Sequence, residues 1–279
     1  MIATSDATDE AASGPSSQTV YFGLAELDLL TTHAGVRMPY PVRVPCYGRT
    51  AAERAAVLAM AGATLTARRL ADHAGPTGLA AELVAALRDR RSTVDLVLTG
   101  IARGPVGVLA LRCGSAALVC RQPLARGHTN QVAVTRVYQD GLADELFRDV
   151  PRLAGATVAP ISLDAGVVSA ATSAAGEREE VARDRLRALA MAAGGDPDEL
   201  DRLAALLPTV TGRGQLGATS AGRRTDELSW LDGPAGRVRI DHGKDGWVSV
   251  NPLRPKDIHR FIRRLACGVA ESNTGKEPR

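Results

Sequence analysis

Residues 208–251 read PTVTGRGQLGATSAGRRTDELSWLDGPAGRVRIDHGKDGWVSVN, and this stretch is the most informative part of the sequence for the fold. Short runs of alternating apolar and polar residues are separated by turns rich in Gly, Asp and Pro, as in antiparallel hairpins. The pattern predicts four strands, at Thr209–Leu216, Glu227–Leu231, Arg237–Asp241 and Trp247–Val250. We therefore expect an antiparallel meander in this part of the chain.

Side chains alternate between the two faces of a strand, so each predicted strand carries two sets of residues. The apolar residues of the last two strands, from Val238 to Val250, fall on one face and are expected to be buried. The opposite face carries charged residues such as Arg237 and Arg239, and we expect it to meet water or a partner.

The order of predicted elements occurs twice along the chain, which we interpret as an internal duplication. The first copy has a strand with a short helix, a helical region, a three-strand meander and a closing helix, at Thr19–His33, Thr50–Arg90, Asp95–Arg121 and Leu142–Val150. The second copy repeats this order at Thr157–Ala174, Glu177–Leu207, Glu227–Val250 and Arg254–Cys267.

The duplication predicts a single domain over residues 18–268, with pseudo-halves 18–151 and 152–268. Residues 1–17 are mostly small and polar and have little apolar surface to bury, so we expect a disordered tail there. Residues 269–279 are expected to form a second polar tail.

The bulk composition argues against several classes of protein. A formal net charge of +3 is too small to indicate nucleic-acid binding. No apolar run approaches the length of a spanning helix, and the N-terminus lacks the pattern of a signal peptide, so we expect no membrane insertion. The four cysteines lie far apart, which suits a reducing compartment and gives no zinc-binding spacing. These features predict a cytoplasmic protein without a metal site.

The segment Gly212–Gly217 matches the G-x-G-x-x-G fingerprint of dinucleotide-binding proteins, and Asp232 follows where a ribose-binding acid would stand. That chemistry needs a helix to begin at the glycines, because the helix N-terminus binds the pyrophosphate. Here residues 218–224 are poor helix formers and a strand follows them. We favour a glycine-rich strand that allows close approach of neighbouring groups, and keep a nucleotide-dependent enzyme as the alternative.

No other pattern in the sequence indicates catalysis. The five histidines are scattered, and no Ser or Cys lies in the turn typical of a nucleophile. We therefore expect no enzymatic activity, no catalytic residue and no cofactor. An arginine-bearing sheet face beside apolar helices remains, and this combination suits a surface that binds another protein.

The residues GRGQLGATSAGRRT, SWLDGPAGRVRI and DGWVSVNPL, followed by an amphipathic C-terminal helix, resemble the EspG family of type VII (ESX) secretion systems in actinobacteria. The resemblance spans residues 19–267 and is most specific over residues 212–251. It implies an α/β (α+β) fold in which a central, largely antiparallel sheet is flanked by two helical bundles, with quasi-two-fold related halves. This expectation agrees with the duplication above.

The resemblance also implies a function. Members of the family are cytosolic chaperones that bind PE–PPE heterodimers at the tip of the PPE protein, keep them soluble and aid their delivery to the secretion machinery. The sequence does not identify the ESX system or the PE–PPE pair. It also leaves room for weak self-association, and for a member of the family that has lost PE–PPE binding.

The partner-binding surface is expected where the second half of the sheet meets the second helical bundle. Three leucines of the helix before the meander are candidates for its apolar part, although they also suit the core of the bundle. The predicted polar contacts are Arg213, Gln215, Ser229, Arg237 and Arg239, and the candidate apolar residues are Leu200, Leu203 and Leu206.

Overall fold

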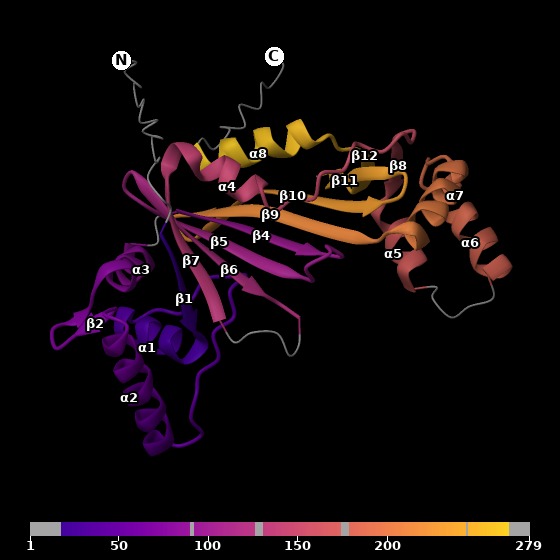
Figure 1. Cartoon of the computed structure of the whole chain (residues 1–279). Helices are drawn as coiled ribbons and strands as arrows, with labels where there is room; N and C mark the ends of the chain where they lie inside the picture. Colours follow the sequence, from indigo (N-terminus) through magenta and orange to yellow (C-terminus); the bar gives the residue numbers. More distant parts are fainter. Residues whose placement is uncertain (1–17, 90–91, 126–130, 174–178, 244, 268–279) are drawn as a thin grey trace, which may run out of the picture.

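The protein is built on one large antiparallel sheet, seen in a computed structural model that describes residues 18–89, 92–125, 131–173, 179–243 and 245–267 (Figure 1). The sheet has ten strands in the order β1-β7-β6-β5-β4-β9-β10-β11-β12-β8, and every pair of neighbours is antiparallel. The strands are β1 Thr19–Gly23, β4 Ser92–Thr99, β5 Val106–Cys113, β6 Ala116–Pro123, β7 Gln131–Tyr138, β8 Ile161–Asp164, β9 Gly212–Ser220, β10 Arg223–Gly233, β11 Gly236–His242 and β12 Trp247–Pro252.

The strand order is the same on both sides of the central β4–β9 pair. Read outward from this pair, β5, β6, β7 and β1 on one side correspond to β10, β11, β12 and β8 on the other. The helices follow the same sequence in each half: three precede the central strand and one follows the meander. The mixed helix and antiparallel sheet architecture predicted from the sequence is confirmed. A two-fold relation between the halves, and the domain limits given above, stay predictions.

One face of the sheet is covered by two helices, α4 (Leu142–Phe147) and α8 (Pro255–Cys267). The α8 sequence places apolar residues three and four positions apart, so one stripe of the helix can be buried. Ile258, Phe261 and Ile262 of this stripe pack on Leu216, Trp230 and other apolar residues of the central strands. We call this the covered face; α4 and α8 lie along the top of the molecule in Figure 1.

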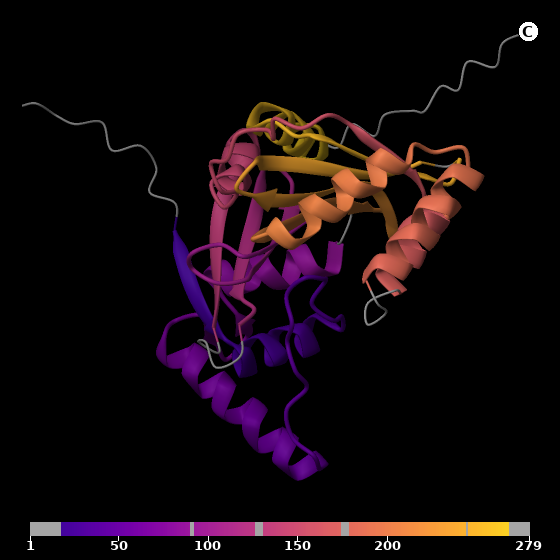
Figure 2. The same cartoon turned by 90° about the vertical axis from the view of Figure 1, so that its right-hand side faces the viewer.

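The other face carries the remaining helices in two separate groups, which lie at opposite ends of the sheet (Figures 1 and 2). Bundle 1 packs on the strands of the first half through residues such as Leu109 and Leu118, and bundle 2 packs on the second half through Leu231 and Val250. Bundle 1 consists of α1 Leu24–Ala34, α2 Ala51–Ala67 and α3 Gly78–Asp89, and bundle 2 of α5 Ala165–Ser173, α6 Glu179–Ala192 and α7 Pro197–Leu206.

Local signals in the sequence place several helix ends correctly. Thr50 caps α2 by accepting a hydrogen bond from the backbone N–H of Glu53, whose side chain bonds back to the cap. Asp196 caps α7, and Pro197 occupies the first turn, where its missing N–H costs nothing.

Other boundaries differ from the predictions. The strand expected at the start of Thr157–Ala174 is limited to β8. β9 and β10 are longer than predicted, because Ala221 and Gly222 both adopt positive φ and join them in a tight hairpin. The tails expected at residues 1–17 and 269–279 lie outside the described residues.

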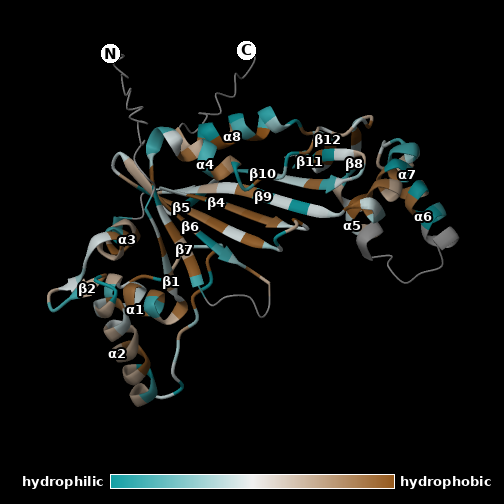
Figure 3. Cartoon of the chain, in the orientation of Figure 1, coloured by the Kyte–Doolittle hydropathy of each residue, from teal (hydrophilic) through white to brown (hydrophobic). Residues whose placement is uncertain are grey.

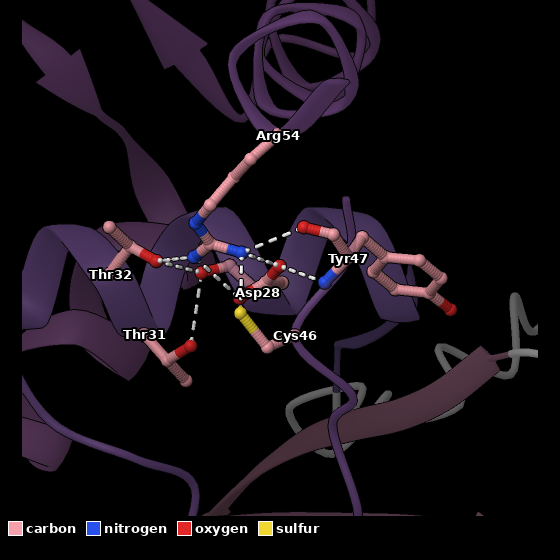
Figure 4. Close-up of polar contacts among 6 residues, drawn as sticks. All are labelled: Asp28, Thr31, Thr32, Cys46, Tyr47 and Arg54. Carbon is pink, nitrogen blue, oxygen red and sulfur yellow. Dashed lines mark hydrogen bonds and ion pairs between the residues drawn. The ribbon is translucent and has the colours of Figure 1, made fainter. Parts of the chain in front are cut away.

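A polar cluster ties bundle 1 together (Figure 4). The Arg54 guanidinium of α2 donates to both carboxylate oxygens of Asp28 in α1, at 2.9 and 3.1 Å, and to the Cys46 Sγ and the Tyr47 carbonyl between the helices. The hydrogen bonds to Asp28 raise the pKa of Arg54 above its ordinary value. This network fixes the loop from residues 35–50 against bundle 1.

Candidate partner-binding surface

The middle of the sheet is left open between the two bundles. Opposite residues of an antiparallel pair lie on the same face, so Val97, Gln215, Ser229 and Ile240 share the face that carries both bundles. Ile240 packs against the core of bundle 2, whereas the residues nearer the centre are half-buried or exposed. We call this surface the open strip, and its residues are Val97, Thr99, Arg213, Gln215, Glu227 and Ser229.

A chain of polar contacts runs along the open strip. Arg224, at the hairpin end of β10, forms ion pairs with Asp95 of β4 and with Glu227, whose Oε2 lies 3.2 Å from Arg224 Nη2. Glu227 accepts a further hydrogen bond from the Gln215 side chain, and the Ser229 hydroxyl lies 3.5 Å away. The strip therefore presents hydrogen-bonding groups held in fixed positions by neighbouring strands.

These contacts change the protonation of the charged groups. Burial raises the pKa of Glu227, but hydrogen bonds from Gln215, Arg224 and Ser229 and the charge of Arg224 outweigh it, so the pKa is lowered. Burial lowers the pKa of Arg224, but Asp95 and Glu227 outweigh it, so the pKa is raised. Both groups therefore stay charged at neutral pH.

The glycines of the G-x-G-x-x-G segment lie within β9 and open no helix. They make room for larger groups of β10: a Cβ on Gly214 would lie 2.0 Å from the Trp230 ring, and one on Gly217 would lie 2.3 Å from the Arg224 guanidinium. The close approach expected of a glycine-rich strand is thus found. The geometry that a bound pyrophosphate requires is not formed by these residues.

Two of the five predicted polar contacts do not share a face of the sheet with the other three. Arg237 and Arg239 are opposite Asp232 and Trp230, on the covered face, and not beside Gln215 and Ser229. Arg237 is 0% exposed, so the expectation that it meets water or a partner is wrong. Its guanidinium bonds both Asp232 oxygens, one at 2.9 Å, and it lies 5.5 Å from the Trp230 ring.

The covered position of Arg237 has a cause far away in the sequence. The backbone at residues 154–156 runs alongside Arg237, with hydrogen bonds from Arg237 N to the Ala154 carbonyl and from Ala156 N to the Arg237 carbonyl. The Pro151 carbonyl also accepts from the Arg237 side chain. Arg239, in contrast, is partly exposed and pairs with Asp241.

The three candidate leucines of α7 differ in exposure. Leu200 and Leu203 are 4% and 7% exposed and form part of the core of bundle 2. A core position for these leucines was the alternative interpretation of the sequence. Leu206 is half-buried and packs at the edge of that core. Of the three, Leu206 is therefore the residue best placed to contact a partner without opening the bundle.

Bundle 2 also exposes apolar residues that the sequence interpretation missed. Leu207 follows α7 and is 48% exposed, and Met191 and Leu189 of α6 are 65% and 42% exposed. The helical periodicity of α6 could have predicted two of them. Leu186 and Ala190 mark the buried stripe of this helix, and Leu189 and Met191 lie outside that stripe. Figure 3 shows hydrophobic colour interspersed with hydrophilic colour along α6 and α7.

In the part of the chain that the structure describes, no group of three or more His, Cys, Asp or Glu residues is arranged to hold a metal ion. Among the helices of that part, none combines the length and the apolar character needed to cross a membrane.

Comparison with protein families gives one match over most of the chain. The model of the EspG family matches residues 24–264, from the start of α1 to the last turn of α8, so that β1 and the end of α8 lie outside it. A comparison with curated proteins finds no match.

Comparison with solved structures agrees in fold. The Mycobacterium tuberculosis type VII secretion system chaperone EspG5, solved in complex with the PE25–PPE41 dimer, is similar with a TM-score of 0.60 and 13% identity, over 89% of this chain and 95% of that one. HtdX of M. tuberculosis is matched with a TM-score of only 0.16 and 12% identity, over 85% of this chain and 100% of that one, which supports no conclusion.

Proposed function

The chain belongs to the EspG family, and from this membership we propose that it is a cytoplasmic chaperone of type VII secretion. In this proposal it binds a PE–PPE heterodimer at the tip of the PPE protein, keeps the dimer soluble and aids its delivery to the secretion machinery. It acts by binding and carries no catalytic activity of its own. The solved EspG5 complex, which holds a PE25–PPE41 dimer on a protein of the same fold, motivates the choice of partner.

The open strip beside bundle 2 is the observation that supports this function. An apolar tip on a secreted protein promotes aggregation unless it is covered. A binding surface with apolar residues beside polar groups in fixed positions can cover such a tip and orient it. Leu206 and Leu207, at the end of α7 and a few residues before β9, offer apolar surface, and Arg213 and Gln215 of β9 offer polar groups.

Co-expression with a PE–PPE pair, followed by affinity capture through a tag on this chain, tests the proposal. The wild-type chain should retain the dimer in solution and co-elute with it. A Ser229→Arg variant places a long charged side chain in the strip and should lose most of the dimer, because the partner would clash with it. Arg239→Ala, on the covered face, is the matched control and should capture the dimer as the wild type does.

The nucleotide-dependent enzyme remains the alternative function, and a thermal-shift titration with NAD or NADP separates the two. A ligand that binds only the folded state raises the melting temperature, and the rise continues to grow as the ligand concentration exceeds its Kd. We expect no shift with either nucleotide and a rise with the PE–PPE dimer. A rise with a nucleotide, together with no capture of any PE–PPE pair, would overturn the proposal.

A further inference from the structure

A cavity of about 410 Å³ lies at the end of the open strip that is far from bundle 2. Its walls come from three places in the sequence: the loop at residues 35–50, the start of β4, and the β9–β10 hairpin. The residues that line it are Pro39, Tyr40, Thr93, Asp95, Thr219, Gly222 and Arg224.

The buried carboxylate in this wall is only half satisfied. Asp95 is 2% exposed, and its Oδ1 pairs with Arg224. Its Oδ2 is buried and has no hydrogen-bond partner among the residues that the structure describes. A buried carboxylate oxygen without a donor is unfavourable, so a donor that enters the cavity would be held firmly.

The charges around the cavity favour a cation. Arg224 is the basic residue of the cavity wall, and it is shared between the carboxylates of Asp95 and Glu227. The three groups together carry one formal negative charge. A second positive group that approaches Asp95 from the cavity therefore meets a net attraction.

The other walls suit the head of a basic side chain. Thr93 and Thr219 are directly opposite each other on β4 and β9, so their hydroxyls lie near Asp95 on the same face. These hydroxyls can accept the additional N–H donors of an ammonium or guanidinium group. Tyr40 is 54% exposed and offers an aromatic ring, which attracts cations through its π face.

We propose that this cavity receives a lysine or arginine side chain of the bound PE–PPE dimer, with Asp95 Oδ2 as the acceptor. The proposal rests on the proposed function and adds a second anchor to it. The apolar contacts at bundle 2 would cover the partner at one end of the strip, and the basic side chain would fix its orientation at the other. Partners without a basic residue at the matching position would bind less well, because they leave Asp95 Oδ2 without a donor.

The affinity for the PE–PPE dimer, measured by isothermal titration calorimetry, tests the cavity through three variants. Asp95→Asn removes the charge and should weaken binding on the order of tenfold. Tyr40→Leu leaves the Asp95–Arg224 pair intact but removes the aromatic ring, and should weaken binding by roughly threefold. Glu82→Gln, which removes an exposed carboxylate of α3 outside the cavity, is the control and should bind as the wild type does.

Melting temperatures of all variants show whether each is folded before its affinity is interpreted. If the wild type binds the dimer and folded Asp95→Asn and Tyr40→Leu bind equally well, the cavity holds only water and this proposal is wrong, while the proposed function stands. If the wild type binds no PE–PPE dimer, the proposed function fails, and the cavity is then judged by a separate probe.

That probe is butylammonium chloride, followed by NMR chemical shifts and compared with sodium chloride at equal ionic strength. Saturable shifts at Tyr40, Thr93 and Thr219 in the wild type, absent in Asp95→Asn, would support a site for a basic group whatever the partner is. An absence of saturable shifts in the wild type would overturn the assignment.

Discussion

The two faces of the sheet at β9, β10 and β11 differ in what covers them. On the covered face, Trp230 and Arg237 lie beneath α8 and the segment from residues 151–156, and both are almost fully buried. On the opposite face, Gln215 of β9 and Ser229 of β10 stay accessible between the bundles. The contrast lies in what covers each face, since both faces carry polar side chains.

The comparison has a practical consequence for mutagenesis. A substitution on the covered face should act on the free energy of unfolding, and one on the open strip should act on partner binding. The predictions below test this division, beginning with the largest expected effect.

The largest effect is expected from Asp232→Ala. It leaves the Arg237 guanidinium buried and unpaired, which should lower the free energy of unfolding by about 3–5 kcal/mol in urea denaturation. The double variant Asp232→Leu/Arg237→Met should recover much of that loss, because two apolar groups need no partner. If Asp232→Ala were as stable as the wild type, Arg237 would have to find another acceptor, and the importance of the ion pair would be contradicted.

Gly214→Ala should have the next largest effect. The added Cβ would lie 2.0 Å from the ring of the buried Trp230, so we expect a loss of roughly 1–3 kcal/mol in the free energy of unfolding from overpacking. Gly62→Ala in α2 is the matched control, because its Cβ would make an ordinary contact at 3.6 Å and alanine favours the helix. Thermal unfolding of both variants checks the difference, and an unchanged Gly214→Ala would contradict the packing described.

Arginines on the two faces should respond differently to charge reversal. Arg213→Glu on the open strip should weaken PE–PPE binding by about tenfold, or about 1.4 kcal/mol, with little change in stability. Arg239→Glu, on the covered face and partly exposed, should leave the affinity unchanged. Equal effects of the two substitutions on affinity would remove the distinction between the faces.

The smallest effect concerns pH. The pKa of Glu227 is lowered in the folded state, so its contribution to stability is present above its ordinary pKa of 4.5 and is lost as the pH falls through the lowered value. Glu227 is well exposed, so solvent screening limits the contribution to about 0.5 kcal/mol or less. Glu227→Gln should therefore be slightly less stable than the wild type at neutral pH and equal to it in acid, as measured by urea denaturation. If the stability difference between Glu227→Gln and the wild type grew as the pH fell, the lowered pKa of Glu227 would be contradicted.

The sequence predicted the order of elements because that order depends on local patterns. Alternation with turn residues marked the meander, caps such as Asp196 marked the helices, and the repetition of both indicated two halves with one architecture. The family resemblance at residues 212–251 reached the same fold and is matched by the family model over residues 24–264.

The face assigned to Arg237 could not be predicted in the same way. The alternation of side chains along a strand places Val238 and Arg237 on opposite faces of the sheet. It does not show which of the two faces a distant segment of the chain will cover. Both faces of β11 are occupied, one by bundle 2 and the other by the residue 151–156 segment. Asp232, five residues earlier, was a local sign of the pair, because a buried arginine needs a carboxylate. The exposure of Leu207, just beyond the end of α7, likewise depends on how the bundle packs.

The central claim is that the partner binds the open strip and not the covered face. Cysteines introduced as Ser229→Cys and Arg239→Cys, in a background with Cys46, Cys113 and Cys267 replaced by serine and the buried Cys120 retained, allow each face to be probed by maleimide alkylation. The account predicts that the PE–PPE dimer strongly slows alkylation at position 229 and leaves the rate at position 239 unchanged. Protection at position 239, or unchanged alkylation at position 229 in a formed complex, would contradict it.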